Sequence, residues 1–571
     1  MYYDFQVEIP EAKGKIITKK KGSVTYVLYQ YGQEYKSEKR YAIPKRAIIG
    51  KVSSENSSMM FPNEQYQGYF PDAVLPGERN DADRSCCLRI GSWIVIRHVL
   101  DEYHLSEMLY KPLGKNTGLF LDLVSFSIID QDNAGQYYPD FAFCHPLFTD
   151  QMKIYSDVTV SRLLSTVSCD QIITFLDDWN AGRDKKQRIY VSYDSTNKNC
   201  QAGDIDLVEF GKAKDDKGIP VFNVSIAFDK TNRVPLFYEE YPGSITDVSQ
   251  FRCMVDKVIE YGYKKIGFIL DRGYFSKENI QYMDENQYSF IIMAKGCKSL
   301  VTSMVNSIRN TFETDRKCLI RTYKVYGTTI TSRLYEDDTD NRYFHIFYNP
   351  SRQAAEREKL EQKIERYHEF LDQHIGSDTQ FGKTYQDYFN LYYKGKKLVG
   401  VQERSDVVQR ELNLCGYFCI ITSEKMTAEQ ALIQYKGRDI SEKLFSADKS
   451  FLGGQSMRVQ SSEAVSTKIF IEFIALIVRN RIYNLLKETM QKLDGNPNYL
   501  TVPAALRELE KIEMVRRNNG NSILDHAVTR KQKNILAAFG LDEDTVQTNA
   551  AEIASCLAGN QSLINSKRKE A

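Results

Sequence analysis

The chain has 571 residues, of which 42% are hydrophobic and 26% are charged, as is typical of a globular protein with several domains. Its 76 basic and 75 acidic side chains give a net charge of +1, so the total charge does not point to a polyanionic partner. The most apolar run, at 468–486, is interrupted by Lys468, Glu472 and Arg479, and the N-terminus lacks the order of a signal peptide. We therefore expect a cytoplasmic protein without a membrane-spanning segment.

The cysteines and histidines do not predict a metal site. The eleven cysteines are scattered without a C-x-x-C pair, and the seven histidines do not cluster with them. Reduced, mostly buried thiols are the expected state, and a zinc site is not expected.

Two regions precede the predicted core. Residues 22–52 alternate apolar and polar side chains, with Lys and Arg among Tyr, which predicts a small β-rich basic module over residues 1–60. From about Leu88 the apolar spacing becomes helical, at 91–109 and 161–182, and predicts a mainly helical region over residues 61–185.

A mixed sheet is predicted next, over residues 186–296. Strands are expected at 188–195, 219–229 and 234–243, then a helix at 244–262, a strand at 264–271, a helix at 277–287 and a strand at 288–295. Three sequential strands, a helix and a further strand are typical of a mixed sheet with covering helices.

Residues 297–412 break this order and are predicted to be a β-rich insertion. They hold β-like pieces, a charged helix at 351–375 and a basic–aromatic run at 384–404. A strand at 416–423 and a helix at 427–445 resume the core over residues 413–490, and a helical C-terminal region follows over residues 491–571. The predicted class is therefore α/β, with an N-terminal α+β region, an interrupted mixed-sheet core and a helical C-terminus.

Three carboxylates are placed where a site is expected. Asp194 and Asp271 end two predicted strands, which is where an open sheet presents its site, and Glu442 lies on the helix after the last strand. If the first and fourth strands are neighbours, the two aspartates converge and Glu442 can close over them. Three carboxylates repel one another unless a cation neutralises them, and Mg²⁺ or Mn²⁺ suits oxygen ligands. Two such ions can support phosphoryl transfer.

A purely structural role for these acids is the alternative. Aspartates at strand ends are commonly turn formers or helix caps. The acids Asp204, Asp206, Asp229 and Asp247 lie near the same strands and are alternative site residues with weaker placement.

Four polar residues share one predicted helical face. On a helix at about 100° per residue, Tyr435, Arg438, Glu442 and Lys449 fall within an arc of about 60°. Arg438 and Glu442 could be an ordinary i,i+4 pair of an exposed helix. Alternatively, Glu442 binds metal while Arg438 and Lys449 bind phosphates and Tyr435 hydrogen-bonds or stacks on nucleic acid.

The spacing Y-x2-R-x3-E-x6-K, with "YDST" and "DRGY" upstream, resembles that of bacterial insertion-sequence DDE transposases of the IS-four superfamily, YREK subgroup. "YPGSITDVSQF" is similar to the Gly-x-x-x-Asp stretch between the first two acids of that family. The resemblance covers residues 188–490 and implies an RNase H-like core with metal ligands Asp194, Asp271 and Glu442, and DNA contacts from Tyr435, Arg438 and Lys449. It also implies a DNA-binding role for residues 61–185.

The resemblance implies an enzyme that cleaves the ends of its insertion sequence with Mg²⁺ or Mn²⁺, two ions in all, and joins the 3′-OH ends to target DNA. The implied partners are double-stranded terminal inverted repeats and target DNA, with a homodimer in the DNA complex at the nucleoid. Some members form a DNA hairpin and flip a base onto a tryptophan of the insertion. No tryptophan follows Trp179 here, so a flipped base would need another aromatic residue, such as Tyr323, Tyr326 or Phe344. The alternative is that no base is flipped in this way.

Two basic–aromatic runs, at 27–51 and 384–404, are candidates for binding phosphates while their Tyr rings stack on bases. A solvated, Tyr-rich strand surface is an equal alternative for each run.

Two further functions are alternatives for the protein: an RNase H-like nuclease without strand transfer, and an inactive DNA-binding relative. No G-x-x-x-x-G-K-[ST] loop is present, which argues against a nucleotide-driven enzyme.

Overall fold

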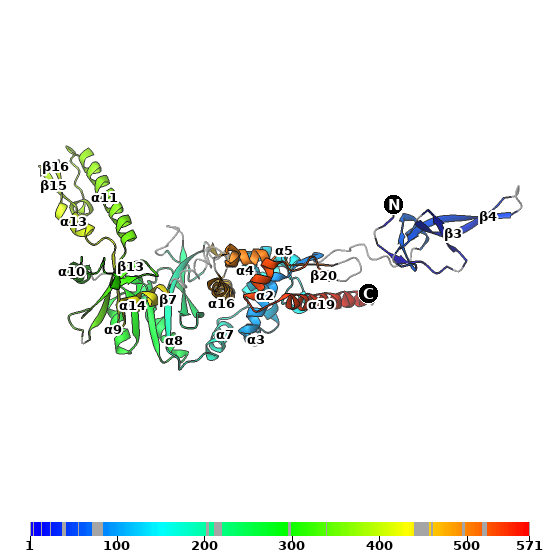
Figure 1. Ribbon diagram of the computed structural model, residues 1–571, viewed down its shortest axis with the longest axis horizontal. Helices are drawn as coiled ribbons and strands as arrows, with labels where there is room; N and C mark the ends of the chain where they lie inside the picture. The colour runs from blue at the N-terminus through cyan, green and yellow to red at the C-terminus, as the bar shows by residue number, and fades with distance from the viewer. Residues whose placement is uncertain are drawn as a thin grey trace. The chain divides into compact units, whose positions relative to one another are not determined.

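The structure is a computed structural model of the chain, shown in Figure 1. It describes residues 1–571 except 1, 4, 13, 23, 37–40, 55, 71–72, 74–83, 201–204, 211–219, 295–297, 339, 439–455, 458, 460, 494–496, 517–521 and 570–571. Two compact units divide the chain: Met1–Val99 with Gln136–Asp157 and Ile482–Ala571, and Leu100–Gly135 with Val158–Arg481. Within the described part of the chain, every helix is too short or too polar to cross a bilayer.

The first unit contains a five-stranded antiparallel sheet of order β1-β5-β4-β3-β2, which confirms that the first residues are β-rich. Its elements are β1 (Val7–Glu8), β2 (Ile16–Lys21), β3 (Val24–Lys36), β4 (Tyr41–Val52), β5 (Met59–Pro62) and helix α1 (Glu64–Tyr69). Alternate residues of the strands face the core, where Val27, Ile49 and Met60 are fully buried and pack with Tyr66 of α1.

The same unit also pairs strands from distant parts of the chain. A three-stranded sheet of order β20-β19-β6 joins β6 (Cys87–Arg89), β19 (Glu513–Arg516) and β20 (Ser522–Leu524). The helices of this part are α5 (Tyr138–Cys144), α17 (Val502–Leu509), α18 (Arg530–Ala537) and α19 (Glu543–Lys569). The C-terminal region is thus largely helical, as predicted, with two additional strands.

The helical periodicity between 91 and 182 is confirmed, with breaks between the helices. The helices are α2 (Gly91–Glu102), α3 (Leu105–Leu113), α4 (Thr117–Ile129), α6 (Asp157–Leu164) and α7 (Cys169–Ala181). His104, with φ of 53°, separates α2 from α3, because a left-handed residue cannot continue a helix. Ser168 and Gln171 form the capping box that starts α7.

The second unit is built on a ten-stranded sheet. Its main order is β12-β13-β14-β17-β11-β10-β7-β8-β9, with β18 beside β7. The strands are β7 (Ile189–Cys200), β8 (Val221–Asp229), β9 (Val234–Pro242), β10 (Ile266–Leu270), β11 (Ser289–Met293), β12 (Leu319–Ile320), β13 (Val325–Ser332), β14 (Arg342–Tyr348), β17 (Tyr417–Thr422) and β18 (Ser456–Met457). Strands β7, β8 and β9 are antiparallel to one another, whereas β10 is parallel to β7 and β11 is parallel to β10. The mixed α/β sheet and the pairing of its first and fourth strands are therefore confirmed.

Helices cover both faces of this sheet. On one face, Phe251 of α8 (Asp247–Glu260) packs against Phe268 of β10, and α9 (Lys277–Glu285) follows. On the other face, α14 (Ala428–Lys436) packs against β10, β11 and β17, and Phe473 of α16 (Ser462–Gln491) contacts Tyr238 of β9. The buried Lys198 of β7 pairs with Glu472 of α16 at 2.8 Å.

Residues 297–412, predicted to be an insertion, divide between two structures. After α10 (Lys298–Ile308), strands β12, β13 and β14 extend the main sheet, because β14 pairs with β17 over six residues. The remainder has its own apolar core, made by α11 (Pro350–Gln373), α12 (Lys383–Gln386), α13 (Ser405–Leu412) and the hairpin of β15 (Phe389–Lys394) with β16 (Lys397–Glu403). The predicted domain boundaries remain predictions.

His345 of β14 is a buried titratable group in the extended sheet. Its ring nitrogens lie 2.9 Å from Thr329 Oγ1 and 3.0 Å from Thr422 Oγ1. Because the Thr422 hydroxyl already donates to the Glu424 carbonyl, it accepts from His345 Nε2, and Nδ1 accepts from Thr329. Burial lowers the pKa of His345 to about 4.

We expect this group to make the sheet acid-sensitive. The pKa is 6.5 unfolded and about 4 folded, so below pH 6.5 the unfolded chain binds the proton first and stability falls until about pH 4. At pH 5 the loss is about 2 kcal/mol. Comparing thermal unfolding of the wild type and His345→Gln at pH 7 and pH 5 checks this. The variant should lose less stability on acidification, and equal losses in both proteins would contradict the assignment.

Candidate active site

The two predicted aspartates come from neighbouring parallel strands. Strand β10 pairs with β7 as far as Leu270↔Tyr193, which places Asp271 level with Asp194. Adjacent strands lie about 4.8 Å apart. The pairing therefore brings two carboxylates that are distant in the sequence to one position on the sheet.

One expectation about these strands is wrong. Asp194 does not end its strand, because β8 continues to pair with β7 beyond it, as far as Asn199↔Val221. Asp271 does follow the last residue of β10 and caps the short 3₁₀ turn at Arg272–Tyr274. The two acids thus meet where β10 ends beside the middle of β7.

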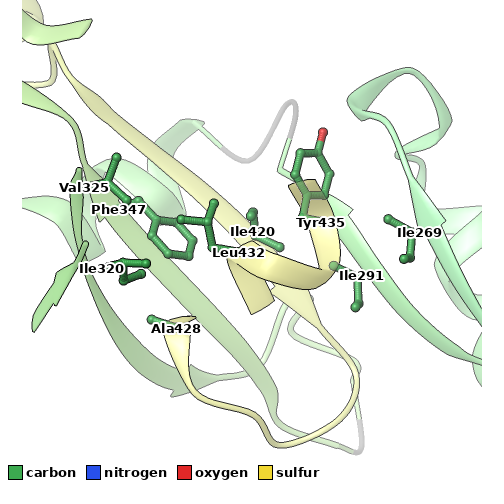
Figure 2. Close-up of a cluster of buried hydrophobic side chains, with 9 residues drawn as sticks. All are labelled: Ile269, Ile291, Ile320, Val325, Phe347, Ile420, Ala428, Leu432 and Tyr435. Atoms are coloured by element: carbon green, nitrogen blue, oxygen red, sulfur yellow. The ribbon is translucent and has the colours of Figure 1, made fainter. Parts of the chain in front are cut away.

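Both aspartates lie on the face of the sheet that α14 covers. Ile269, two residues before Asp271, packs in a buried cluster with Leu432 and Tyr435 of α14 (Figure 2). Side chains alternate along a strand, so Asp271 and, by register, Asp194 share this face. Figure 2 shows the ring of Tyr435 among the apolar residues, with its hydroxyl directed away from them.

Several donors converge on one oxygen of Asp271. Its Oδ1 accepts hydrogen bonds from the Arg272 backbone N–H at 2.7 Å and the Tyr435 hydroxyl at 3.3 Å, and Arg438 Nη1 lies 3.4 Å away. Arg438 is only 8% exposed. A guanidinium so shielded from water interacts strongly with a carboxylate, so Asp271 has a positively charged partner within the chain itself.

The helix that carries Tyr435 is shorter than predicted. It ends at Lys436, and Arg438 follows the C-cap residue Gly437 instead of continuing the same helical face. Tyr435 and Arg438 are still neighbours, with the guanidinium carbon 5.3 Å from the ring centroid. The other two residues of the predicted face, Glu442 and Lys449, lie outside the described residues.

Lys230 accounts for this helix end. Its Nζ donates to the carbonyls of Ile433 at 3.3 Å and Gln434 at 2.9 Å, and to Gln434 Oε1 at 2.7 Å. The last carbonyls of a helix lack partners within it, and a cation there is favourable. A Cβ at Gly437 would lie 1.9 Å from Lys230 Cε, so a larger residue there would displace the lysine side chain from this position. Burial lowers the pKa of Lys230 to about 8.

Sequence reasoning did not identify Lys230. The residue lies in the turn after β8, about two hundred positions before the helix that it caps, and its neighbours indicate only a turn. The contact exists because strand β8 ends close to the end of α14, which the sequence pattern does not predict.

Of the alternative acids, Asp229 is the last residue of β8 and caps the turn that follows it. Its Oδ1 accepts from the backbone N–H of Thr231 at 2.8 Å and of Asn232 at 3.1 Å, and burial raises its pKa. Asp206 also lies in a turn, Asp247 is the first residue of α8, and Asp204 is outside the described residues.

Among the aromatic residues proposed to hold a flipped base, Phe344 is fully buried in the sheet, so its ring faces are already covered. Tyr323 and Tyr326 are partly exposed. Of the three examples, only the two tyrosines therefore have ring surface that a base could reach, and the flipped-base role remains a prediction.

Two of the three predicted carboxylate ligands, Asp194 and Asp271, lie on neighbouring strands and suit a hard divalent cation. No cluster of three or more His, Cys, Asp or Glu side chains suited to a metal occurs among the described residues. Asp194 and Asp271 nevertheless bring two carboxylates together, and such oxygens suit Mg²⁺ and Mn²⁺. The third predicted ligand, Glu442, belongs to the segment 439–455, which the described ranges do not include.

Comparison with known proteins identifies one family. A family model described as the transposase DDE domain matches residues 191–478, half of the chain. No curated protein matches. One similar solved structure is a cryo-EM structure of the piggyBac transposase synaptic complex with hairpin DNA, at 8% sequence identity and a TM-score of 0.32. That match covers 73% of this chain and 70% of that chain. The family match includes Asp194, Asp271, Tyr435 and Arg438.

The cap made by Lys230 yields a stability prediction. Lys230→Met removes the donor from two carbonyls of the last turn, and we expect the free energy of unfolding to fall by about 1–3 kcal/mol. Urea unfolding followed by circular dichroism measures the change. Lys425→Met, at an exposed lysine before the same helix, is the matched control and should differ from wild type by less than about 0.5 kcal/mol. Equal effects of the two substitutions would argue against the cap.

Proposed function

We propose a function from one premise: this chain belongs to the family of the transposase DDE domain, and it is a transposase. The proposed reaction is cleavage at the ends of its own insertion sequence by metal-dependent hydrolysis, followed by joining of the freed 3′-OH ends to target DNA. The observation that carries the proposal is the parallel register of β7 and β10, which makes Asp194 and Asp271 neighbours within the matched segment.

An RNase H-like fold for the core and membership of one transposase subgroup are also proposed. An RNase H-like core is supported by three antiparallel strands, β7 to β9, followed by β10 and β11 in parallel on the other side of β7. Membership of the IS-four superfamily, YREK subgroup, rests on the sequence spacing of Tyr435, Arg438, Glu442 and Lys449.

In the proposed site, Asp194, Asp271 and Glu442 hold Mg²⁺ or Mn²⁺, two ions in all. When bound, such ions neutralise phosphate charge and activate the attacking water or hydroxyl. The residues of the chain position the ligands: the donors on Asp271 Oδ1 fix the orientation of that carboxylate, which would be one ligand of the cation.

Arg438 and Tyr435 are proposed to contact the transposon-end DNA beside the carboxylates. A guanidinium binds phosphate oxygens through paired N–H groups, and Arg438, which lies beside Asp271, would be placed to bind a phosphate next to carboxylates that held a cation. Lys449 is proposed to hold a further phosphate. The proposed partners are double-stranded inverted repeats and target DNA, bound by a homodimer at the nucleoid.

Loss of a proposed metal ligand should separate cleavage from binding. We expect Glu442→Gln and Asp271→Asn each to abolish Mg²⁺-dependent cleavage of DNA that carries the inverted repeats flanking the gene. Affinity for the same DNA should stay within about twofold, because phosphate contacts dominate binding. Glu429→Gln, at an exposed acid of α14, is the control and should cleave normally. Full cleavage by Glu442→Gln would refute the triad.

A second assay separates transposition from its alternatives. Pre-cleaved ends with a free 3′-OH are incubated with plasmid DNA and Mg²⁺, and joined products are counted. Joining supports the proposed function. Cleavage without joining would indicate an RNase H-like nuclease, and binding without either reaction would indicate an inactive DNA-binding relative.

A further inference from the structure

The outer face of the N-terminal sheet carries an alternating row of basic and aromatic side chains. Lys19 of β2 pairs with Tyr26 of β3, Tyr26 with Lys51 of β4, and Lys51 with Phe61 of β5. These four residues, the basic–aromatic row, therefore lie side by side across four strands. With strands about 4.8 Å apart, the two rings are about 10 Å apart, with Lys51 between them and Lys19 at one end.

The row faces away from the core of the sheet. Val27 and Met60, which adjoin row members along β3 and β5, are fully buried in the opposite cluster. Because successive side chains point to opposite faces, Tyr26 and Phe61 lie on the other side, where both are partly exposed. No residue of the row belongs to the buried cluster that the described residues of this sheet form.

Lys51 of the row contacts the ring of Phe61 and that of Tyr2, an aromatic residue next to the row. Lys51 Nζ lies 5.1 Å from the ring centroid of Phe61 and 5.5 Å from that of Tyr2. Tyr2 is 36% exposed and lies 6.4 Å from Tyr26 between ring centroids. Two aromatic rings thus flank the Lys51 ammonium group, and the third, Tyr26, lies beside Tyr2. Rings and a cation side by side favour a ligand with both flat π-faces and negative charge.

Most neighbouring positions named on the same face are apolar or basic. Ile17, Leu28 and Ile48 form the next row, and Ile48 is 41% exposed. Beyond them Arg46 pairs with Gln30. Glu8, on the edge strand β1, is the acid that register places on this face.

We propose that this face binds single-stranded nucleic acid, with unpaired bases stacked on Tyr26 and Phe61 and phosphates held by Lys19 and Lys51. Duplex DNA would present its charged backbone to Ile17, Leu28 and Ile48, which cannot contact phosphates favourably. Unpaired bases can cover these apolar side chains while the lysines hold the backbone. This binding site is separate from the carboxylate site and does not depend on the proposed catalytic function.

Fluorescence anisotropy with the full chain tests the proposal. The probes are a labelled 20-nucleotide single strand of mixed sequence, as DNA and as RNA, and the matching DNA duplex. We expect Tyr26→Leu and Phe61→Leu each to weaken single-strand binding about tenfold or more, because each base stacked on a ring is lost. Duplex binding should change less than about twofold. Tyr35→Leu, at a tyrosine of β3 that is 67% exposed and outside the row, is the matched control.

A charge variant keeps the test decisive if a ring variant misfolds. Lys51→Gln should reduce the salt dependence of single-strand binding by about 0.7 in the slope of log K against log salt. Single-strand affinities within about twofold of wild type in the ring variants, or an unchanged salt slope in Lys51→Gln, would overturn the proposal. Equal weakening of duplex and single strand would also overturn it, since the face would then hold backbone alone. Asp271→Asn should leave single-strand binding unchanged, so the two proposals fail independently.

Discussion

Parallel pairing between β7 and β10 is the constraint on which the rest of the site depends. It sets two aspartates level on adjacent strands, on the face that α14 covers. Neighbouring carboxylates repel each other in a partly buried setting, so the fold must supply positive charge or hydrogen-bond donors nearby. Arg438 and Tyr435 meet this need at Asp271, and α14, which carries Tyr435 and leads to Arg438, is held against the sheet by its own apolar residues.

Periodicity was sufficient to predict most elements of the core. The strands at Val221–Asp229, Val234–Pro242 and Ile266–Leu270 are short apolar runs bounded by turn residues. In α8, which lies between the last two, buried apolar residues recur every three or four positions. Local pattern does not report which distant strands pair. The sequence therefore predicts that β13 and β14 belong to the insertion. In the structure, β14 continues the core sheet by pairing with β17.

In the site too, sequence motifs predict individual residues but not the contacts that distant segments make. Asp194, Asp271, Tyr435 and Arg438 could be selected from motifs and spacing, and the structure brings Asp271, Tyr435 and Arg438 into contact. The end of α14 could not be predicted, because it depends on Lys230, which reaches it from another strand, and on the space left at Gly437. The pattern that predicts one helix over residues 427–445 is thus met, in the described part of that range, by α14 and a turn at residues 437–438.

The position of Asp194 inside a twelve-residue strand has a consequence for how the site can adjust. Asp194 pairs with Ile226 of β8. On its other edge, β7 pairs with β10 as far as Tyr193. Asp271 begins a turn, and Arg438 follows a helix end. Asp194 is therefore held by strand pairing at its own position, whereas Asp271 and Arg438 lie at the ends of elements. Adjustment of this pair of carboxylates to a ligand therefore falls to Asp271 and its neighbours, with Asp194 as the fixed reference point.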